Sequence, residues 1–189
     1  YRMKRSVEID RPLDSSKSGG HARIRICRRQ SIMTTALEKL LRPRSIAILG
    51  ASADFNKIGG RPLKFLIEKG FPGRILPVNP RYETIGDLPC YPDIGAVPGP
   101  VDLAVVALAA DLVIETVEAL GAAGVPAAVV FSSGFGEMGP EGRVREATLL
   151  DTARKAGVRI LGPNGLGHIN AFDRVYGTFT QYAYGETPA

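Results

Sequence analysis

The sequence is poor in the residues that build metal sites, disulfide frameworks and membrane spans. It has two cysteines, Cys27 and Cys90, in 189 residues, with no C-x-x-C spacing and no histidine close to either. Neither a zinc site nor a disulfide framework is therefore encoded, and a reducing, cytoplasmic setting is expected. No apolar run approaches the roughly 18 residues that a membrane span needs. The composition, 44% hydrophobic and 23% charged, is that of an ordinary globular protein of one domain without a membrane partner.

The formal charge of +5 lies in the N-terminal part of the sequence. Residues 1–33 hold nine of the 24 Lys and Arg residues and three of the 19 Asp and Glu residues, which leaves 15 basic and 16 acidic residues for positions 34–189. The globular part is thus nearly neutral, and we expect no nucleic-acid partner. The first 33 residues have no hydrophobic periodicity, so we predict a disordered basic extension. We favour the interpretation that the protein naturally starts at Met33 and that the residues before it are an upstream extension. The alternatives for these residues are a targeting segment and a functional basic arm.

From Leu41 onward, apolar strands alternate with amphipathic helices. The predicted strands are "SIAILG" (45–50), "RILPVNP" (74–80), "VDLAVVAL" (101–108), "PAAVVFSSG" (126–134) and "VRILGPN" (158–164). Continuous runs of Val, Ile, Leu and Ala are typical of strands buried on both faces of a parallel sheet. We therefore predict a doubly wound, Rossmann-like α/β domain over 34–172, with helices on both faces and the strand order 3-2-1-4-5 in chain numbering. Ligands of such domains bind at the carboxyl ends of the strands.

The loop after the first predicted strand, "GASADFNKIGG", has the composition of a phosphate-binding turn. The G-x-G-x-x-G fingerprint is absent, because the glycines after Gly50 are Gly59 and Gly60. Gly50 nevertheless permits a tight turn, Ser52 offers a hydroxyl, Lys57 adds a charge, and Gly59 lets the backbone approach a ligand before the next helix. A plain strand-to-helix turn is the alternative for this segment.

The loops after the second, fourth and fifth strands narrow the class of ligand. An NAD-binding fold places an acidic residue near the position where this sequence has Asn79, Pro80 and Arg81. Arg81 would attract a phosphate, which favours NADP or coenzyme A. The small residues of "FSSG" and "GPNG" suit an extended pantetheine arm. No Tyr-x-x-x-Lys pair or His-Asp pair for hydride chemistry follows the strands, which argues against NADP.

Five segments together resemble the CoA-binding domain of the NDP-forming acyl-CoA synthetases, relatives of the succinyl-CoA synthetase alpha subunit. They are "RSIAILGAS", "ILPVNPRYETIGDLPCYPDI", "GPVDLAVVAL", "AAVVFSSGFGE" and "ILGPNGLGHIN", within residues 41–171. The resemblance implies four groups of residues around CoA. The loop around the CoA phosphates consists of Gly50, Ala51, Ser52, Lys57 and Gly59, and the nucleotide is flanked by Val78, Asn79, Pro80 and Arg81. The adenine side is contacted by Ala107 and Leu108, and the pantetheine arm lies along Ser132, Ser133, Gly134, Asn164 and Gly165.

The same resemblance implies a reaction among an acid, CoA, a nucleoside triphosphate, acyl-CoA, a nucleoside diphosphate and phosphate, through a phosphorylated histidine in the next domain. Neither His21 nor His168 fits that histidine, because we expect His21 in the disordered extension and His168 in a loop with a local hydrogen bond. We therefore expect this chain to bind CoA without catalysing, and we assign no catalytic or metal-binding residue. Residues 173–189 resemble a connector toward further ligase domains or subunits. A stand-alone CoA-binding regulatory module and an NADP-binding oxidoreductase domain remain the alternatives. The family often has cysteine where this chain has Gly165.

Overall fold

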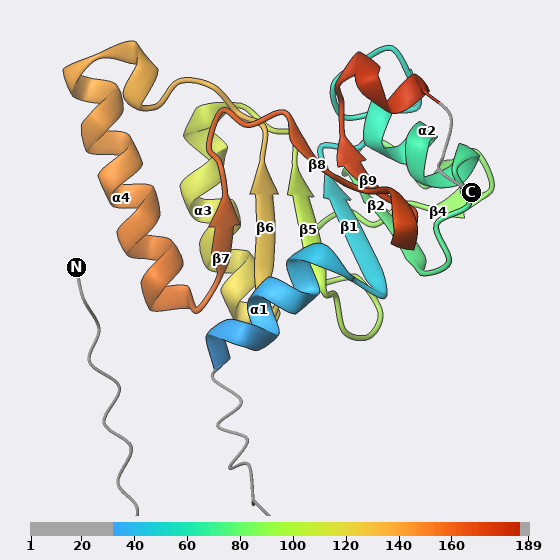
Figure 1. Cartoon of the computed structure of the whole chain (residues 1–189). Coiled ribbons are helices and arrows are strands. Elements are labelled where there is room, and N and C mark those ends of the chain that lie inside the picture. The colour runs from blue at the N-terminus through green and yellow to red at the C-terminus, as the bar shows by residue number, and fades with distance from the viewer. Residues whose placement is uncertain (1–31, 186–189) are drawn as a thin grey trace, which may run out of the picture.

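Our computed structural model describes residues 32–185, and most of the predicted 1–33 extension lies outside them. Its centre is a five-stranded parallel sheet, as predicted (Figure 1). Every strand residue of the three central strands is buried, which matches their continuous apolar sequences. The strands are β1 (Ser45–Leu49), β2 (Arg74–Val78), β5 (Leu103–Val106), β6 (Ala127–Val130) and β7 (Arg159–Leu161).

The order of the strands, β2-β1-β5-β6-β7, differs from the predicted order in one respect. In chain numbering it is 2-1-3-4-5, so the third strand pairs with the first strand and not with the second. The outer edge of β2 is taken by the segment that follows it. There Tyr91 forms a parallel bridge with Val78, and its backbone amide donates to the carbonyl of Pro77 at 2.9 Å. The third strand therefore extends the sheet on the free side of β1.

Helices cover both faces of the sheet, as predicted. The helices α3 (Ala110–Ala122) and α4 (Pro140–Ala156) pack on one face through Val113, Val117 and Leu149. The opposite face is covered by α1 (Ile32–Leu41) and α2 (Arg61–Glu68), and α1 crosses in front of the sheet in Figure 1. Neighbouring residues of each central strand point to opposite faces, so Ala47 and Ile48 join different apolar clusters.

Short elements complete the chain. The connection after β2 contains the hairpin of β3 (Thr84–Ile85) and β4 (Leu88–Pro89). After β7, the strands β8 (Gly167–Asn170) and β9 (Val175–Thr178) form a second hairpin, which packs on the α1–α2 side. The 3-10 turns are η1 (Gly136–Met138), η2 (Ala171–Asp173) and η3 (Gln181–Tyr184).

The segment predicted as a connector is packed on the domain over its described part. Val175 and Thr178 are buried, and the Tyr184 ring lies edge-on to Phe65 of α2, with 4.9 Å between ring centroids. The predicted boundary at residue 172 thus falls inside η2. Among the described residues, no helix is long and apolar enough to cross a membrane.

Candidate functional site

The carboxyl ends of the five parallel strands meet at one edge of the sheet, which is the upper edge in Figure 1. The loop after β1 turns there through Gly50, whose φ is +81°. A Cβ on Gly50 would lie 2.4 Å from the carbonyl oxygen of Ala107, and a Cβ on Gly59 would lie 2.0 Å from the carbonyl oxygen of Gly50. Gly50 therefore allows the loops after β1 and β5 to pack closely, and Gly59 allows the two ends of the loop after β1 to meet.

A side-chain amide joins the loops after β1 and β2. The Nδ2 of Asn79 donates to the backbone carbonyl of Ala51 at 2.8 Å, and its Oδ1 accepts from the backbone amide of Arg81 at 3.0 Å. The amide of Gly50 also donates to the carbonyl of Val78 at 3.0 Å. Asn79 thus sets the position of Arg81 relative to the glycine loop.

A second set of hydrogen bonds joins the loops after β5, β6 and β7. The hydroxyl of Ser132 donates to the carbonyl of Leu108 at 2.6 Å, and the amide of Asn164 donates to the carbonyl of Ser132 at 2.9 Å. Gly165 donates its amide to the carbonyl of Val130 at 3.4 Å. The loops after β5, β6 and β7 are therefore joined into one continuous ridge.

A cleft of about 360 Å³ opens between the loop after β2 and the helix α3. Six of the residues named from the sequence line it: Gly50, Val78, Asn79, Pro80, Arg81 and Leu108. The sequence prediction missed eight others: Leu49, Pro92, Asp93, Ile94, Leu112, Glu115, Thr116 and Ala119. Four of the missed residues lie on α3 at the spacing i, i+3, i+4, i+7, which is one face of a helix, but nothing in their residue types distinguishes this face in the sequence.

The other ten predicted site residues lie outside the cleft. Ala51, Ser52 and Gly59 are buried at the foot of the glycine loop, while Lys57 and Ser133 are exposed. Ser52 serves the turn itself, because its Oγ accepts from the amide of Asp54 at 3.1 Å. The remaining members, Ala107, Ser132, Gly134, Asn164 and Gly165, lie along the ridge that continues from the cleft.

The charged groups of the site have both signs. Lys57 and Arg81 are exposed, and neither forms an ion pair within residues 32–185. Glu115 and Asp93 line the same cleft as Arg81, and an oxygen of Asp93 already accepts from the amide of Ala96 at 2.9 Å. The basic pair is thus available to an anionic ligand, whereas the acidic pair faces the cleft from α3 and the loop after β4.

His168 lies in β8, and neither ring nitrogen finds a hydrogen-bond partner of ordinary geometry in the part of the chain described. This corrects the expectation of a loop histidine with a local hydrogen bond. Burial lowers the pKa of His168, and the nearby backbone of Leu40 opposes this shift only in part. Both ring nitrogens are buried, although the residue as a whole is half-buried.

The comparisons with known proteins identify the family of this chain. A family model described as the CoA binding domain matches residues 44–171. The chain belongs to the CoA binding domain family. The resemblance inferred from the five sequence segments is confirmed, and with it coenzyme A as the ligand of this domain.

The relatives of the CoA-binding domain are longer ligases. It is 40% identical over 147 residues to ADP-forming acetate–CoA ligase I of Archaeoglobus fulgidus, covering 78% of this chain and 21% of that protein. It is 41% identical to the alpha subunit of ADP-forming acetate–CoA ligase I of Pyrococcus furiosus, covering 76% of this chain and 32% of the subunit. The solved apo structure of dinucleotide forming acetyl-coenzyme A synthetase 1 of Ca. Korarchaeum cryptofilum matches with a TM-score of 0.73 at 41% identity, covering 76% and 31% of the two chains. The chain thus spans no more than a third of these relatives.

Proposed function

We propose that this CoA-binding domain is the CoA-binding part of an NDP-forming acyl-CoA synthetase. Such an enzyme converts an acid, CoA and a nucleoside triphosphate into acyl-CoA, a nucleoside diphosphate and phosphate. The observation that carries the proposal is the arrangement of the strand-end loops at one edge of the sheet. Hydrogen bonds join the loops after β1 and β2, and others join the loops after β5, β6 and β7. The names of the ligase relatives support the reaction class.

The shape of the edge suits the three parts of CoA. The cleft has apolar walls, with Val78 and Pro80 on one side and Leu108 on the other, as a flat adenine requires. Arg81 at its rim and Lys57 in the neighbouring loop supply charge for the 3′-phosphate and the pyrophosphate. The pantetheine arm would then run along the ridge past Ser133, Gly134, Asn164 and Gly165.

In this proposal the chain binds CoA and other domains or subunits complete the reaction. The one described histidine, His168, is half-buried in β8 and both of its ring nitrogens are buried, so it is not placed to carry a phosphoryl group. The partners would supply the phosphorylated histidine and the nucleotide site. A cytoplasmic location is part of the proposal, because Cys90 is a buried free thiol of the kind that reducing compartments preserve.

A domain exchange tests the proposal. Residues 44–171 would replace the matching segment of the Archaeoglobus fulgidus ligase, to which the chain is 40% identical. We expect acid-dependent formation of acyl-CoA by the chimaera and none by this chain alone. Calorimetry with CoA on the isolated chain is the control. A folded chimaera without ligase activity, made from a chain that still binds CoA, would favour a stand-alone regulatory module instead.

A further inference from the structure

The loop after β6 is held by charged side chains as well as by backbone hydrogen bonds such as that from Asn164 to Ser132. The amide of Gly136 donates to Oε2 of Glu146 at 2.9 Å, and the Nη1 of Arg145 donates to the carbonyl of Gly134 at 2.8 Å. The amides of Gly134 and Phe135 donate to the same oxygen of Glu137, at 2.5 and 3.3 Å. Four backbone groups of three consecutive residues therefore have side-chain partners.

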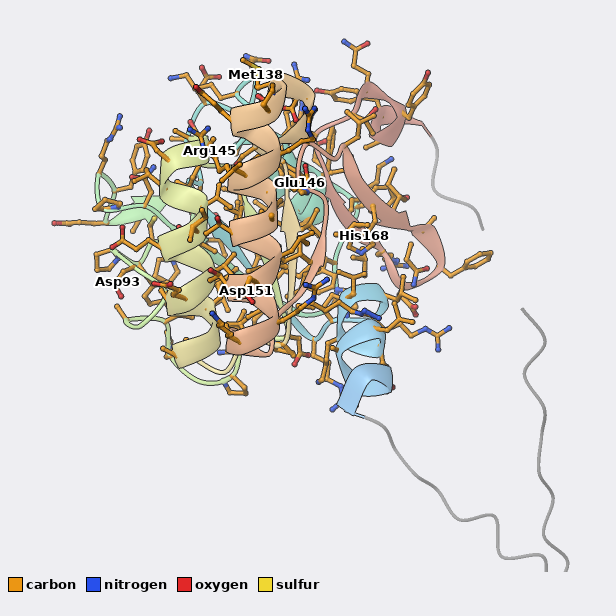
Figure 2. All side chains as sticks on the ribbon, turned by 90° about the vertical axis from the view of Figure 1, so that its left-hand side faces the viewer. Asp93, Met138, Arg145, Glu146, Asp151 and His168 are labelled. Atoms are coloured by element: carbon orange, nitrogen blue, oxygen red, sulfur yellow. The ribbon has the colours of Figure 1, made fainter. Side chains whose placement is uncertain are left out.

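Two of these partners come from α4. Figure 2 labels Arg145 and Glu146 on the upper turns of α4, near Met138 at the end of the loop. The helix lies directly against the loop, because a Cβ on Gly142 would be 1.8 Å from the carbonyl oxygen of Phe135. A Cβ on Gly136 would likewise lie 2.4 Å from the carboxylate of Glu146. The helix therefore packs directly against the loop, and Arg145 and Glu146 hold its backbone from α4, while Glu137 holds it from within the following turn.

We propose that Arg145 and Glu146 are positioning residues, which hold the 132–136 loop in the conformation that receives the pantetheine arm of CoA. This inference rests on the proposed course of that arm along Ser133 and Gly134. Neither Arg145 nor Glu146 lines the cleft that would take the nucleotide. Their effect is therefore confined to the arm.

The expected change in CoA affinity follows from the fraction of molecules in which the 132–136 loop has the conformation that receives the pantetheine arm, called here the competent loop. Gly134 has a φ of +103°, a conformation that other residues rarely adopt, and a glycine-rich loop freed from its partners samples many alternatives. The apparent dissociation constant rises in inverse proportion to the fraction of molecules with the competent loop. A loop that is competent about a tenth of the time weakens CoA binding about tenfold.

The experiment compares two ligands by calorimetry on the full chain. CoA has the pantetheine arm, whereas adenosine 3′,5′-bisphosphate carries the nucleotide end alone. For Glu146→Ala and Arg145→Ala we expect CoA to bind about tenfold more weakly and the bisphosphate to change by less than about twofold. Glu146→Gln should keep most of the CoA affinity, because its amide oxygen still accepts from Gly136.

Asp151→Ala and Arg154→Ala are the matched controls, since both residues are exposed on α4 and Asp151 lies lower on the same helix in Figure 2. Both controls should bind the two ligands as the unchanged protein does. Unchanged CoA binding by Glu146→Ala, or an equal loss for both ligands, would overturn the inference. Where Glu146→Ala does not fold, Arg145→Ala decides by the same criterion. If the unchanged protein binds neither ligand, the proposed function itself fails.

Discussion

The side chain of Asn79 donates a hydrogen bond of 2.8 Å to the backbone carbonyl of Ala51 and so ties the loop after β2 to the loop after β1. The same side chain accepts from the amide of Arg81. One residue thereby fixes the distance between the glycine loop and the basic group nearest the cleft.

Replacing Asn79 tests this link. Asn79→Ala removes both hydrogen bonds and should lower the free energy of unfolding by about 1 to 2 kcal/mol, together with a loss of CoA affinity. Asn79→Asp keeps the acceptor for Arg81 but loses the donor to Ala51, so its CoA affinity separates the two contacts. Urea unfolding and calorimetry provide the measurements. Wild-type stability in Asn79→Ala would show that the link is dispensable.

Discrimination between CoA and dephospho-CoA tests the charges at the site. A charge-assisted contact to the 3′-phosphate should make CoA bind about tenfold more tightly than dephospho-CoA. The variants Arg81→Ala and Lys57→Ala should each reduce this preference, whereas Arg154→Ala and Lys155→Ala on α4 should not. Calorimetry giving equal affinities for both ligands in the unchanged protein would remove Arg81 and Lys57 from this role.

Replacing Gly59 or Gly165 with alanine should change the free energy of unfolding by different amounts. A Cβ on Gly59 would lie 2.0 Å from the carbonyl oxygen of Gly50, so Gly59→Ala must separate the two ends of the loop after β1 at a cost of about 1 to 3 kcal/mol. A Cβ on Gly165 would have its nearest contact at 3.7 Å, with Gly162. Gly165→Ala should change stability by less than about 0.5 kcal/mol. Chemical denaturation of both variants distinguishes them, and equal costs would contradict the packing described.

His168 predicts a pH dependence of stability. Because burial lowers its pKa below the value of 6.5, the unfolded chain binds a proton at higher pH than the folded chain does. This contribution to stability is therefore complete above about pH 6.5 and is lost as the pH falls below it.

The measurement is urea unfolding at about pH 7.5 and about pH 5.5. The loss of stability between these two values should be smaller in His168→Gln than in the unchanged protein. His21→Gln, at the only other histidine, is the control and should behave as the unchanged protein. An identical loss in all three proteins would assign the pH dependence to other groups.

The sequence by itself determined the parallel α/β class, the five main strands and the family. Apolar runs such as "VDLAVVAL" are local, and a strand buried on both faces needs no partner to be identified. The residues at the strand ends could also be named, because parallel strands place all their carboxyl ends at one edge. Gly50, Asn79, Arg81 and Leu108 do meet at the cleft.

Only the tertiary structure decided which elements became neighbours. Strand β5 pairs with β1 while Tyr91 bridges the outer edge of β2, and both are contacts between distant segments that no local preference specifies. Tertiary packing also decides which face of α3 lines the cleft. It likewise brings Arg145 and Glu146 within hydrogen-bond distance of the 132–136 loop. From the sequence alone, a charged residue on a helix is predicted to be solvent-exposed. Its hydrogen-bond partner is determined only when packing brings a distant backbone group within hydrogen-bond distance.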